Sequence, residues 1–252
     1  MRSVFCLCGE SMYKNRLKLK MIERVLLILN CVFLLTGCGN RSAQNPDTDT
    51  ENSTLSLGEQ PEQKLTETDL RVMKSLVRIQ AGDLLGSGVI YEEEEDTILI
   101  ATAGHVLAHD TGEIVVGFPD GTQVKADGVE NVENCDLAFV WVDKKKLSKE
   151  TWESCIPVQT DCKVFDSLEA YEDVWMYGGG SQDAVYAFIV DPWIYVEDFD
   201  QYMMLLQGNI VPGMSGGGVF MENGTFVGIL CGADDTGKVA AVPYSIVETE
   251  KP

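Results

Sequence analysis

The segment Gly213-Met214-Ser215-Gly216-Gly217 places a serine hydroxyl in a glycine-rich turn. Glycine adopts backbone conformations that are closed to residues with a Cβ, so the chain can project the hydroxyl of Ser215 while the N–H groups of Gly213 and Ser215 point together. A nucleophile beside an oxyanion hole requires this geometry. Loops also use glycine and serine for backbone freedom alone, so the turn gains meaning only from partners elsewhere in the chain.

A nucleophilic serine needs a base, and the chain has two histidines, His105 and His109. His105 follows the apolar run 98–101 and three small residues, which predicts an imidazole at the exit of a strand, facing a cleft. His109 lies in a polar segment and is predicted to be a solvated loop residue. Taken alone, His105 would more commonly be a hydrogen-bonded histidine packed behind a strand.

Asp136 opens the apolar run 136–142 and therefore lies at the edge of the expected core. An aspartate in that position holds one histidine tautomer and stabilises the imidazolium formed when a serine gives up its proton. The alternative is an ordinary aspartate in the turn before a strand. The order His105, Asp136, Ser215 is that of the chymotrypsin fold and differs from the orders in subtilisin and the α/β-hydrolases.

With these residues in place, the chain resembles the trypsin-like (chymotrypsin-fold) serine proteases, and most of all their bacterial HtrA or Do-like branch. Four segments carry the resemblance over the region from about 70 to 247: Gly86-Ser87-Gly88-Val89-Ile90, Thr102-Ala103-Gly104-His105-Val106, Asp136-Leu137-Ala138, and Pro212-Gly213-Met214-Ser215-Gly216-Gly217. Weaker matches are 226–230 and 240–243, which resemble the strands that line the substrate cleft.

The resemblance implies an all-β fold of two six-stranded antiparallel β-barrels with the active site in the cleft between them. It implies a serine endopeptidase that works through an acyl-enzyme on peptide or unfolded-protein substrates, with no cofactor and no metal. The implied roles are base for His105, orienting carboxylate for Asp136, nucleophile for Ser215, and oxyanion hole for the N–H groups of Gly213 and Ser215.

The same resemblance implies a pocket for the first substrate side chain. Position 209 lacks the acid of a trypsin-like pocket and the second half of the chain has no histidine, so a small or medium apolar side chain is expected. The expected pocket residues are Asn209, Ile210, Leu230, Cys231, Gly232 and Ala240.

Two residues depart from the family pattern. Met214 stands where many trypsin relatives have an aspartate. That aspartate forms an ion pair with the amino terminus released during zymogen activation, which a thioether cannot do. Cys231 stands near the position of a small hydroxyl residue that backs the catalytic aspartate. Because a thiol is a poorer donor, Asp136 is expected to be less well supported and activity to be reduced.

Short apolar runs separated by turn residues predict strands in two halves, about 70–145 and about 155–247. A helix or strand is expected to begin near 66–70, and the lysine-rich stretch 143–150 is expected to be an exposed connection. The expected strands are 75–79, 86–91, 97–101, 114–118, 123–126 and 136–142, then 164–165, 173–177, 184–190, 202–207, 217–221, 225–231 and 239–243.

The amino-terminal region predicts an extracytoplasmic location. Basic residues precede the short apolar stretch 25–35, and 35–38 (Leu-Thr-Gly-Cys) resembles the bacterial lipobox, which implies cleavage before Cys38 and a lipid on it that holds the protein at the membrane. The alternative is an uncleaved anchor helix. Residues 1–37 are then a lipoprotein signal peptide, 38–66 a flexible polar tether, and 67–252 the protease domain, with no room for the PDZ module common in HtrA enzymes.

The formal charge of the chain is −21, and loss of residues 1–37, with six bases and two acids, makes it −25. Such a protein repels nucleic acid and attracts basic peptides. The four cysteines after residue 38 are either free thiols or paired in one of three ways, and a bridge between Cys135 and Cys231 would brace the site: Cys135, Cys155, Cys162 and Cys231. The functional alternative to a peptidase is a non-catalytic protein of the same fold that binds peptides or partner proteins at the cell surface.

Overall fold

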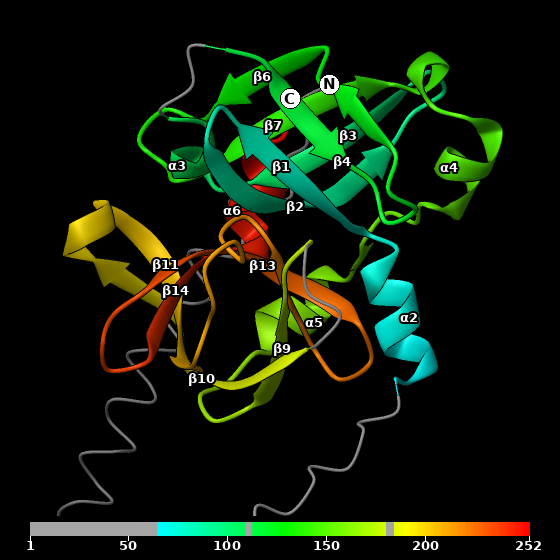
Figure 1. Cartoon of the computed structure of the whole chain (residues 1–252). Coiled ribbons are helices and arrows are strands. Elements are labelled where there is room, and N and C mark those ends of the chain that lie inside the picture. Colours follow the sequence, from blue (N-terminus) through cyan, green and yellow to red (C-terminus); the bar gives the residue numbers. More distant parts are fainter. Residues whose placement is uncertain (1–64, 109–111, 180–183) are drawn as a thin grey trace, which may run out of the picture. The chain divides into compact units, whose positions relative to one another are not determined.

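The computed structural model describes residues 65–108, 112–179 and 184–252, which form two antiparallel β-sheets with a few short helices (Figure 1). The predicted all-β, trypsin-like fold class is confirmed, with one sheet forming a half-barrel and the other a closed barrel. The first sheet contains β1 (Leu76–Ala81), β2 (Leu84–Glu93), β3 (Thr97–Thr102), β4 (Ile114–Gly117), β5 (Gln123–Lys125), β6 (Gly128–Asn131) and β7 (Ala138–Asp143).

The first sheet has the strand order β5-β4-β1-β2-β3-β7-β6. Its central strands are β-branched and apolar, and β3 is buried from Ile98 to Thr102, as expected for a strand covered on both faces. Within the described residues no pairing joins β5 to β6, so this sheet has seven strands and stays open where six closed strands were expected.

The second sheet closes into a barrel. Its order is β12-β9-β10-β11-β14-β13-β8, and a further pairing of β12 with β13 joins six strands in a ring, while β8 adds a short parallel strand outside it. This half matches the six-stranded barrel that the sequence predicted. The strands are β8 (Gln159–Thr160), β9 (Asp173–Tyr177), β10 (Val185–Val196), β11 (Gln201–Gly208), β12 (Gly218–Phe220), β13 (Thr225–Ala233) and β14 (Lys238–Pro243).

Helices lie at the ends of the sheets. Thr66 and Asp69 form a capping box at the start of α2 (Glu67–Met73). The remaining helices are α3 (Gly104–Leu107), α4 (Lys149–Ser154), α5 (Cys162–Ser167), α6 (Tyr244–Glu250) and the 3₁₀ turns η1 (Lys144–Lys146) and η2 (Glu197–Phe199).

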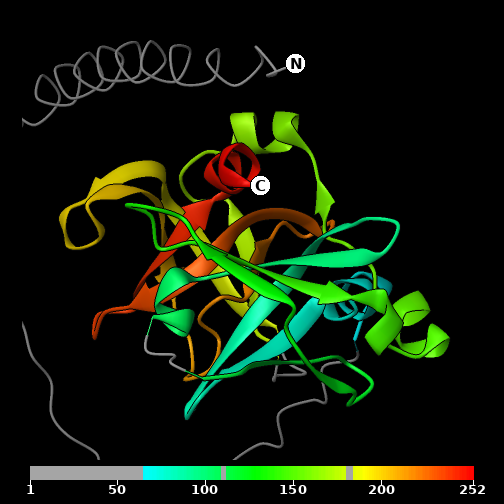
Figure 2. The same cartoon turned by 90° about the horizontal axis from the view of Figure 1, so that it is seen from above.

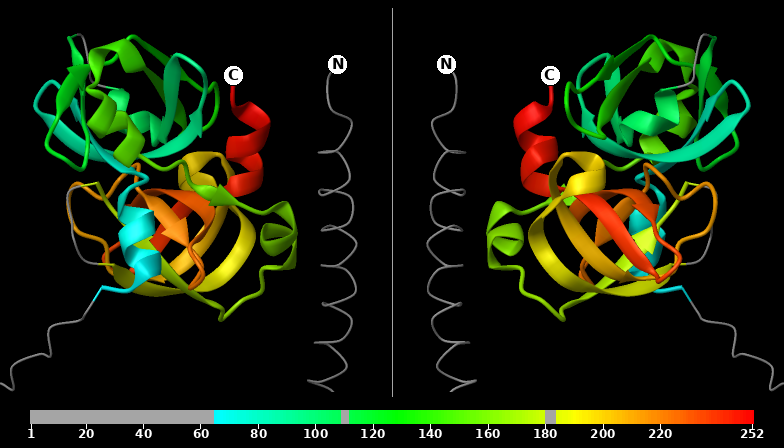
Figure 3. Two further views of the ribbon diagram at one scale, coloured as in Figure 1. Left: turned by 90° about the vertical axis from the view of Figure 1, so that its right-hand side faces the viewer. Right: turned by 90° about the vertical axis from the view of Figure 1, so that its left-hand side faces the viewer.

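Helix α6 lies alongside both sheets (Figure 3). The hydroxyl of Tyr91 in β2 donates to Glu248 at 2.6 Å, and the ring of Tyr244 packs edge-on against Phe226 of β13. Figure 2 shows α5 beside α6, where Phe165 and Tyr244 have ring centroids 5.9 Å apart. The carboxy-terminal helix therefore ties the two sheets together on one side.

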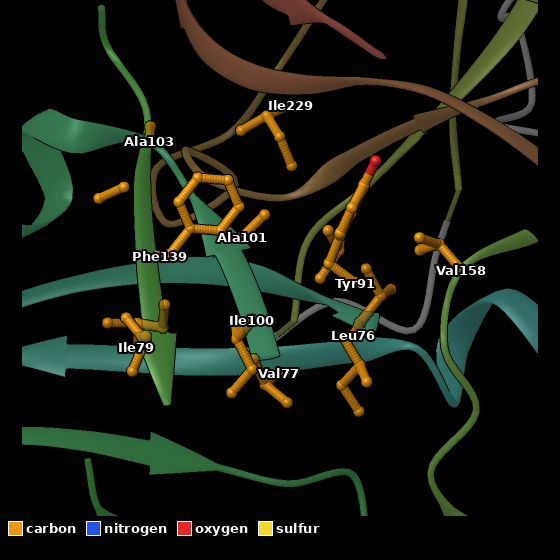
Figure 4. Close-up of a cluster of buried hydrophobic side chains, with 14 of the residues drawn as sticks. Leu76, Val77, Ile79, Tyr91, Ile100, Ala101, Ala103, Phe139, Val158 and Ile229 are labelled. Atoms are coloured by element: carbon orange, nitrogen blue, oxygen red, sulfur yellow. The ribbon is translucent and has the colours of Figure 1, made fainter. Parts of the chain in front are cut away.

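A continuous apolar core crosses the junction of the sheets. Side chains of β1, β2, β3 and β7 gather in it with Ile229 of β13 (Figure 4). Phe139, Ile100 and Ile229 are fully buried. Because the core is shared, the positions of the two sheets are coupled by packing.

Some local predictions were wrong. The strand expected at 164–165 is part of helix α5, whose start is capped by Asp161. The connection at 143–150 is largely exposed, as expected, but it contains η1 and the start of α4, and the sequence did not predict β6 or α6. The signal peptide, Cys38 and the tether up to residue 64 lie outside the described residues. Among the helices of the described part, none is long and apolar enough to cross a bilayer.

Substitutions of Leu76 and Leu85, on the paired strands β1 and β2, test how much this core contributes to the free energy of unfolding. Leu76 is 3% exposed and Leu85 is 67% exposed. We expect Leu76→Ala to lower the free energy of unfolding by about 2 to 5 kcal/mol, because it leaves a cavity. Leu85→Ala should change it by less than about 0.5 kcal/mol. Urea unfolding monitored by tryptophan fluorescence measures both, and equal losses would contradict the packing described.

Candidate active site

His105 lies where β3 leaves the first sheet. β3 ends at Thr102, Ala103 is extended, and the short helix α3 carries His105 in its first turn. The next two residues of the helix, Val106 and Leu107, are buried and fix it to the core, whereas the imidazole is 47% exposed. The ring is thus held at its base and open to solvent at its tip.

Asp136 holds this ring through two groups. Its Oδ2 lies 2.9 Å and its Oδ1 3.1 Å from Nδ1 of His105, and Oδ1 also accepts the backbone N–H of His105 at 2.8 Å. The carboxylate is only 13% exposed. Because an ionised carboxylate only accepts, Nδ1 must carry a proton, and Nε2 is left as the basic nitrogen of the neutral ring.

The contact changes the pKa of both groups. The hydrogen bond with Asp136 raises the pKa of His105 above its ordinary value of 6.5, against the opposing effect of burial. Burial raises the pKa of Asp136, but the hydrogen bonds and charge of His105 outweigh it, so this pKa lies below 3.8. At neutral pH the pair is therefore a carboxylate and an imidazole that accepts a proton more readily than a free one.

Two residues of the second sheet support Asp136. The backbone N–H of Asp136 donates to Oε1 of Gln201, a buried side chain of β11, at 3.2 Å. The thiol of Cys231 in β13 lies 3.7 Å from the carbonyl oxygen of Asp136 and is itself buried. The sequence pointed to Cys231 by resemblance, but nothing in it singled out Gln201, because the contact spans 65 residues.

The serine turn depends on glycine at several positions. Gly213 and Gly216 have φ angles of +92° and +83°, in the region that L side chains rarely adopt. A Cβ on Gly216 would lie 2.1 Å from the carbonyl oxygen of Ser87, and one on Gly217 would lie 2.1 Å from that of Tyr177. At Gly216 and Gly217 the turn therefore packs backbone to backbone against its neighbours, with no space for larger residues.

Ser215 is half-buried on this turn and faces the first sheet. Its carbonyl accepts the N–H of Ser87 in β2 at 2.8 Å, and its hydroxyl donates to the carbonyl of Cys231 at 3.1 Å. Cys231 thus contacts Ser215 through its carbonyl and Asp136 through its thiol. The structure brings His105 and Asp136 into direct contact and Ser215 into the same neighbourhood, but the described residues show no hydrogen bond from Ser215 to His105.

The backbone amides of Gly213 and Ser215 were the expected oxyanion hole. Within the described residues neither N–H has a protein acceptor, whereas the intervening and following amides, of Met214 and Gly216, donate to Val211 and Leu230. The N–H groups of Gly213 and Ser215 are therefore not bound by the carbonyls of Val211 and Leu230, which accept from the neighbouring amides.

The residues expected to line a substrate pocket differ in exposure. Leu230 is fully buried in the second barrel with Met214, and Cys231 and Ala240 are also buried. Gly232 and Ile210 are half-buried, and Asn209 is exposed. Gly232 pairs with Ala240 across a bulge in β13, so the main chain bends at this edge.

Other expectations concerned the four cysteines, metal binding and His109. Cys135, Cys155, Cys162 and Cys231 are all free, so the bridge considered between Cys135 and Cys231 is not formed. Burial raises the pKa of Cys135 to about 12, which makes it a poor nucleophile. In the part of the chain that the structure describes, no cluster of acids, cysteines and histidine is arranged to hold a metal ion. His109 lies outside the described residues.

Comparisons with known proteins agree on the fold. The sequence profile of the trypsin-like peptidase domain family matches residues 86–229, which include His105, Asp136 and Ser215. A search of curated protein sequences finds no match. Two solved structures of the Rv3671c protease of M. tuberculosis H37Rv, both in an inactive form and one a serine-to-alanine mutant, have TM-scores of 0.56 and 18% identity. They cover 72% of this chain, and 87% and 89% of their own.

The contact between His105 and Asp136 predicts a titration that NMR can follow. We expect the His105 ring to titrate with a midpoint above 6.5, because the carboxylate stabilises the imidazolium. Asp136→Asn should lower the midpoint, since a neutral amide gives no such stabilisation. The chain has only two histidines, so His109→Gln assigns the signals. An unchanged midpoint in Asp136→Asn would show that the pair is not formed in solution.

Proposed function

The chain belongs to the trypsin-like peptidase family, and we propose that it is a serine endopeptidase that cleaves peptide bonds through an acyl-enzyme. The observation that carries the proposal is the hydrogen-bonded pair of His105 and Asp136 beside the glycine turn of Ser215. The buried carboxylate and the half-exposed ring have the tautomer and polarity that a general base requires.

In the proposed reaction the hydroxyl of Ser215 leaves the carbonyl of Cys231 and turns to Nε2 of His105. His105 takes the hydroxyl proton as Oγ attacks the scissile carbonyl, and Asp136 stabilises the imidazolium that results. The oxyanion is bound by the N–H groups of Gly213 and Ser215. His105 then protonates the leaving amine, and a water molecule, activated by the same ring, hydrolyses the ester and regenerates Ser215.

The substrates proposed are peptides or unfolded proteins that bind with a small or medium apolar side chain near Ile210, Gly232 and Ala240. Exposed Asn209 brings no charge to that edge, and a formal charge of −21 favours basic segments around the cleavage point. We further propose that the protein acts outside the cytoplasm, held by a lipid on Cys38, and that it is related to the HtrA branch through the segments named above.

The resting position of the serine hydroxyl favours a second candidate. Because Ser215 donates to the Cys231 carbonyl and not to His105, the same fold would also suit a protein that binds peptides in the cleft without cutting them. Thiol support of Asp136 by Cys231 points the same way, since a thiol is a weak donor.

A fluorophosphonate probe separates the two candidates, because it reacts only with an activated serine. We expect the wild-type protein to be labelled with one probe per chain, and Ser215→Ala to lose the label completely. His105→Ala should slow labelling by at least about a hundredfold, in line with the loss of a general base. Intact mass spectrometry measures the label. A folded wild-type protein that stays unlabelled would favour the binding protein.

Cys231→Ser tests the support of Asp136. A hydroxyl is a better donor than a thiol, so the serine variant should hold the main chain of Asp136 more firmly and raise kcat/KM by about threefold to tenfold, equivalent to about 1 kcal/mol. Hydrolysis of a peptide p-nitroanilide measures it. Cys155→Ser is the matched control, because Cys155 is a buried free thiol whose hydrogen bond goes to Thr151. A lower rate in Cys231→Ser alone would contradict the argument.

A further inference from the structure

We propose that Ser87 is a positioning residue for the oxyanion hole, and this proposal rests on the proposed peptidase function. Ser87 lies in β2 of the first sheet and is completely buried. It is far from the serine turn in sequence, and its hydroxyl plays no part in the proton transfers described. Its hydroxyl and its backbone N–H nevertheless both contact the serine turn.

The side chain of Ser87 joins two loops of the second barrel. Its hydroxyl donates to the carbonyl oxygen of Gly213 at 2.6 Å and accepts the N–H of Gly179, just after β9, at 2.8 Å. Both Oγ functions of the serine are thereby used in a site that excludes water. A buried hydroxyl with this pattern is costly to remove, because it leaves one donor and one acceptor without partners.

The main chain of Ser87 contacts the same turn. Its N–H donates to the carbonyl of Ser215 at 2.8 Å, and its own carbonyl accepts the hydroxyl of Thr102 at 2.7 Å. One residue therefore fixes the carbonyls of both Gly213 and Ser215. These are the two residues whose N–H groups form the proposed oxyanion hole.

Fixing those two carbonyls restricts the amides that matter. The peptide planes of the Gly213 and Ser215 carbonyls flank the plane that carries the Ser215 N–H, and the first of them adjoins the plane that carries the Gly213 N–H. Holding both carbonyls therefore restricts how the two amides can turn. Gly213 has φ of +92°, and no heavy atom lies within 4 Å of a Cβ built on it, so no side chain packs against this face of the residue. The hydrogen bond from Ser87 supplies the restraint.

The serine turn has no charged anchor of its own. Met214, between the two amides, is 1% exposed and lies in the apolar cluster of the second barrel. Its sulfur is 3.5 Å from the N–H of Val211. Packing of this kind fills space but gives little direction to a peptide plane, whereas a 2.6 Å hydrogen bond does.

Ser87→Ala tests the proposal with a peptide p-nitroanilide that carries alanine at the cleaved position. We expect kcat to fall about tenfold to a hundredfold, below the loss caused by removing an oxyanion donor outright. KM should change less than about twofold, because ground-state contacts to the substrate are kept. Affinity for a peptide aldehyde, whose hemiacetal oxygen occupies the hole, should fall by the same factor as kcat.

Ser75→Ala is the matched control. Ser75 is also a buried serine of the first sheet region and donates its hydroxyl to the carbonyl of Val72 at 2.7 Å, away from the serine turn. Loss of this bond should lower the melting temperature as Ser87→Ala does but leave kcat and aldehyde affinity unchanged. Ser87→Cys, which keeps a weak donor of similar size, should give a kcat between alanine and wild type.

The outcomes separate the two proposals. If wild type fails to hydrolyse the peptide and to react with the fluorophosphonate, the peptidase function is wrong. If wild type is active and folded Ser87→Ala keeps its kcat and aldehyde affinity, the positioning role is wrong. Equal losses of kcat in Ser75→Ala and Ser87→Ala would also overturn it. Should Ser87→Ala not fold, kcat of Ser87→Cys equal to wild type would overturn the role, and a reduced kcat at unchanged KM would support it.

Discussion

The backbone contact between β2 and the serine turn is the constraint on which the candidate site depends. A hydrogen bond of 2.8 Å joins the N–H of Ser87 to the carbonyl of Ser215, across the junction of the two sheets. Gly216 makes the approach possible, since a Cβ there would fall on the Ser87 carbonyl. Without this approach Ser215 would not reach the neighbourhood of His105 and Asp136, which belong to the first sheet. The geometry of the candidate site is thus a consequence of how closely the two sheets can pack.

The pair of His105 and Asp136 shows how the fold balances an electrostatic cost. Burial of the carboxylate opposes its charge, and on its own it would raise the pKa. Two hydrogen bonds from His105 to the carboxylate, and one from the backbone N–H of Asp136 to Oε1 of Gln201, hold the segment, and the carboxylate stays ionised. The exposed tip of the imidazole then keeps access to solvent and substrate. The buried carboxylate thus anchors the pair, and the exposed tip of the imidazole is the part that faces solvent.

The sequence predicted the fold class and the chemistry-bearing residues because both leave local patterns. Alternating or continuous apolar runs predicted the ends of β1, β3, β7 and β13 to within two residues, and the glycines around Ser215 indicated a turn with positive φ. The short run at 164–165 is apolar, but the side chain of Asp161 caps the start of this segment, and the N-cap favours a helix. Gln201 and the hydroxyl of Ser87 could not be found in this way. Their partners are 65 and 126 residues distant, and no local pattern encodes them.

For the proposed peptidase activity, the orientation of the Ser215 hydroxyl matters less than the hydrogen bonds that hold the serine turn in place. A neutral hydrogen bond such as that to the Cys231 carbonyl contributes about 0.5 to 1.5 kcal/mol net, and its loss is offset when the hydroxyl donates to His105 instead. Rotation about one side-chain bond is fast compared with turnover. By contrast, removing one oxyanion donor costs about 2.7 to 4 kcal/mol in the transition state, and the amides of Gly213 and Ser215 act only if the turn keeps them in place. If the proposed mechanism holds, the difference between a peptidase and a binding protein on this scaffold lies in the backbone of residues 213–215, which Ser87 contacts.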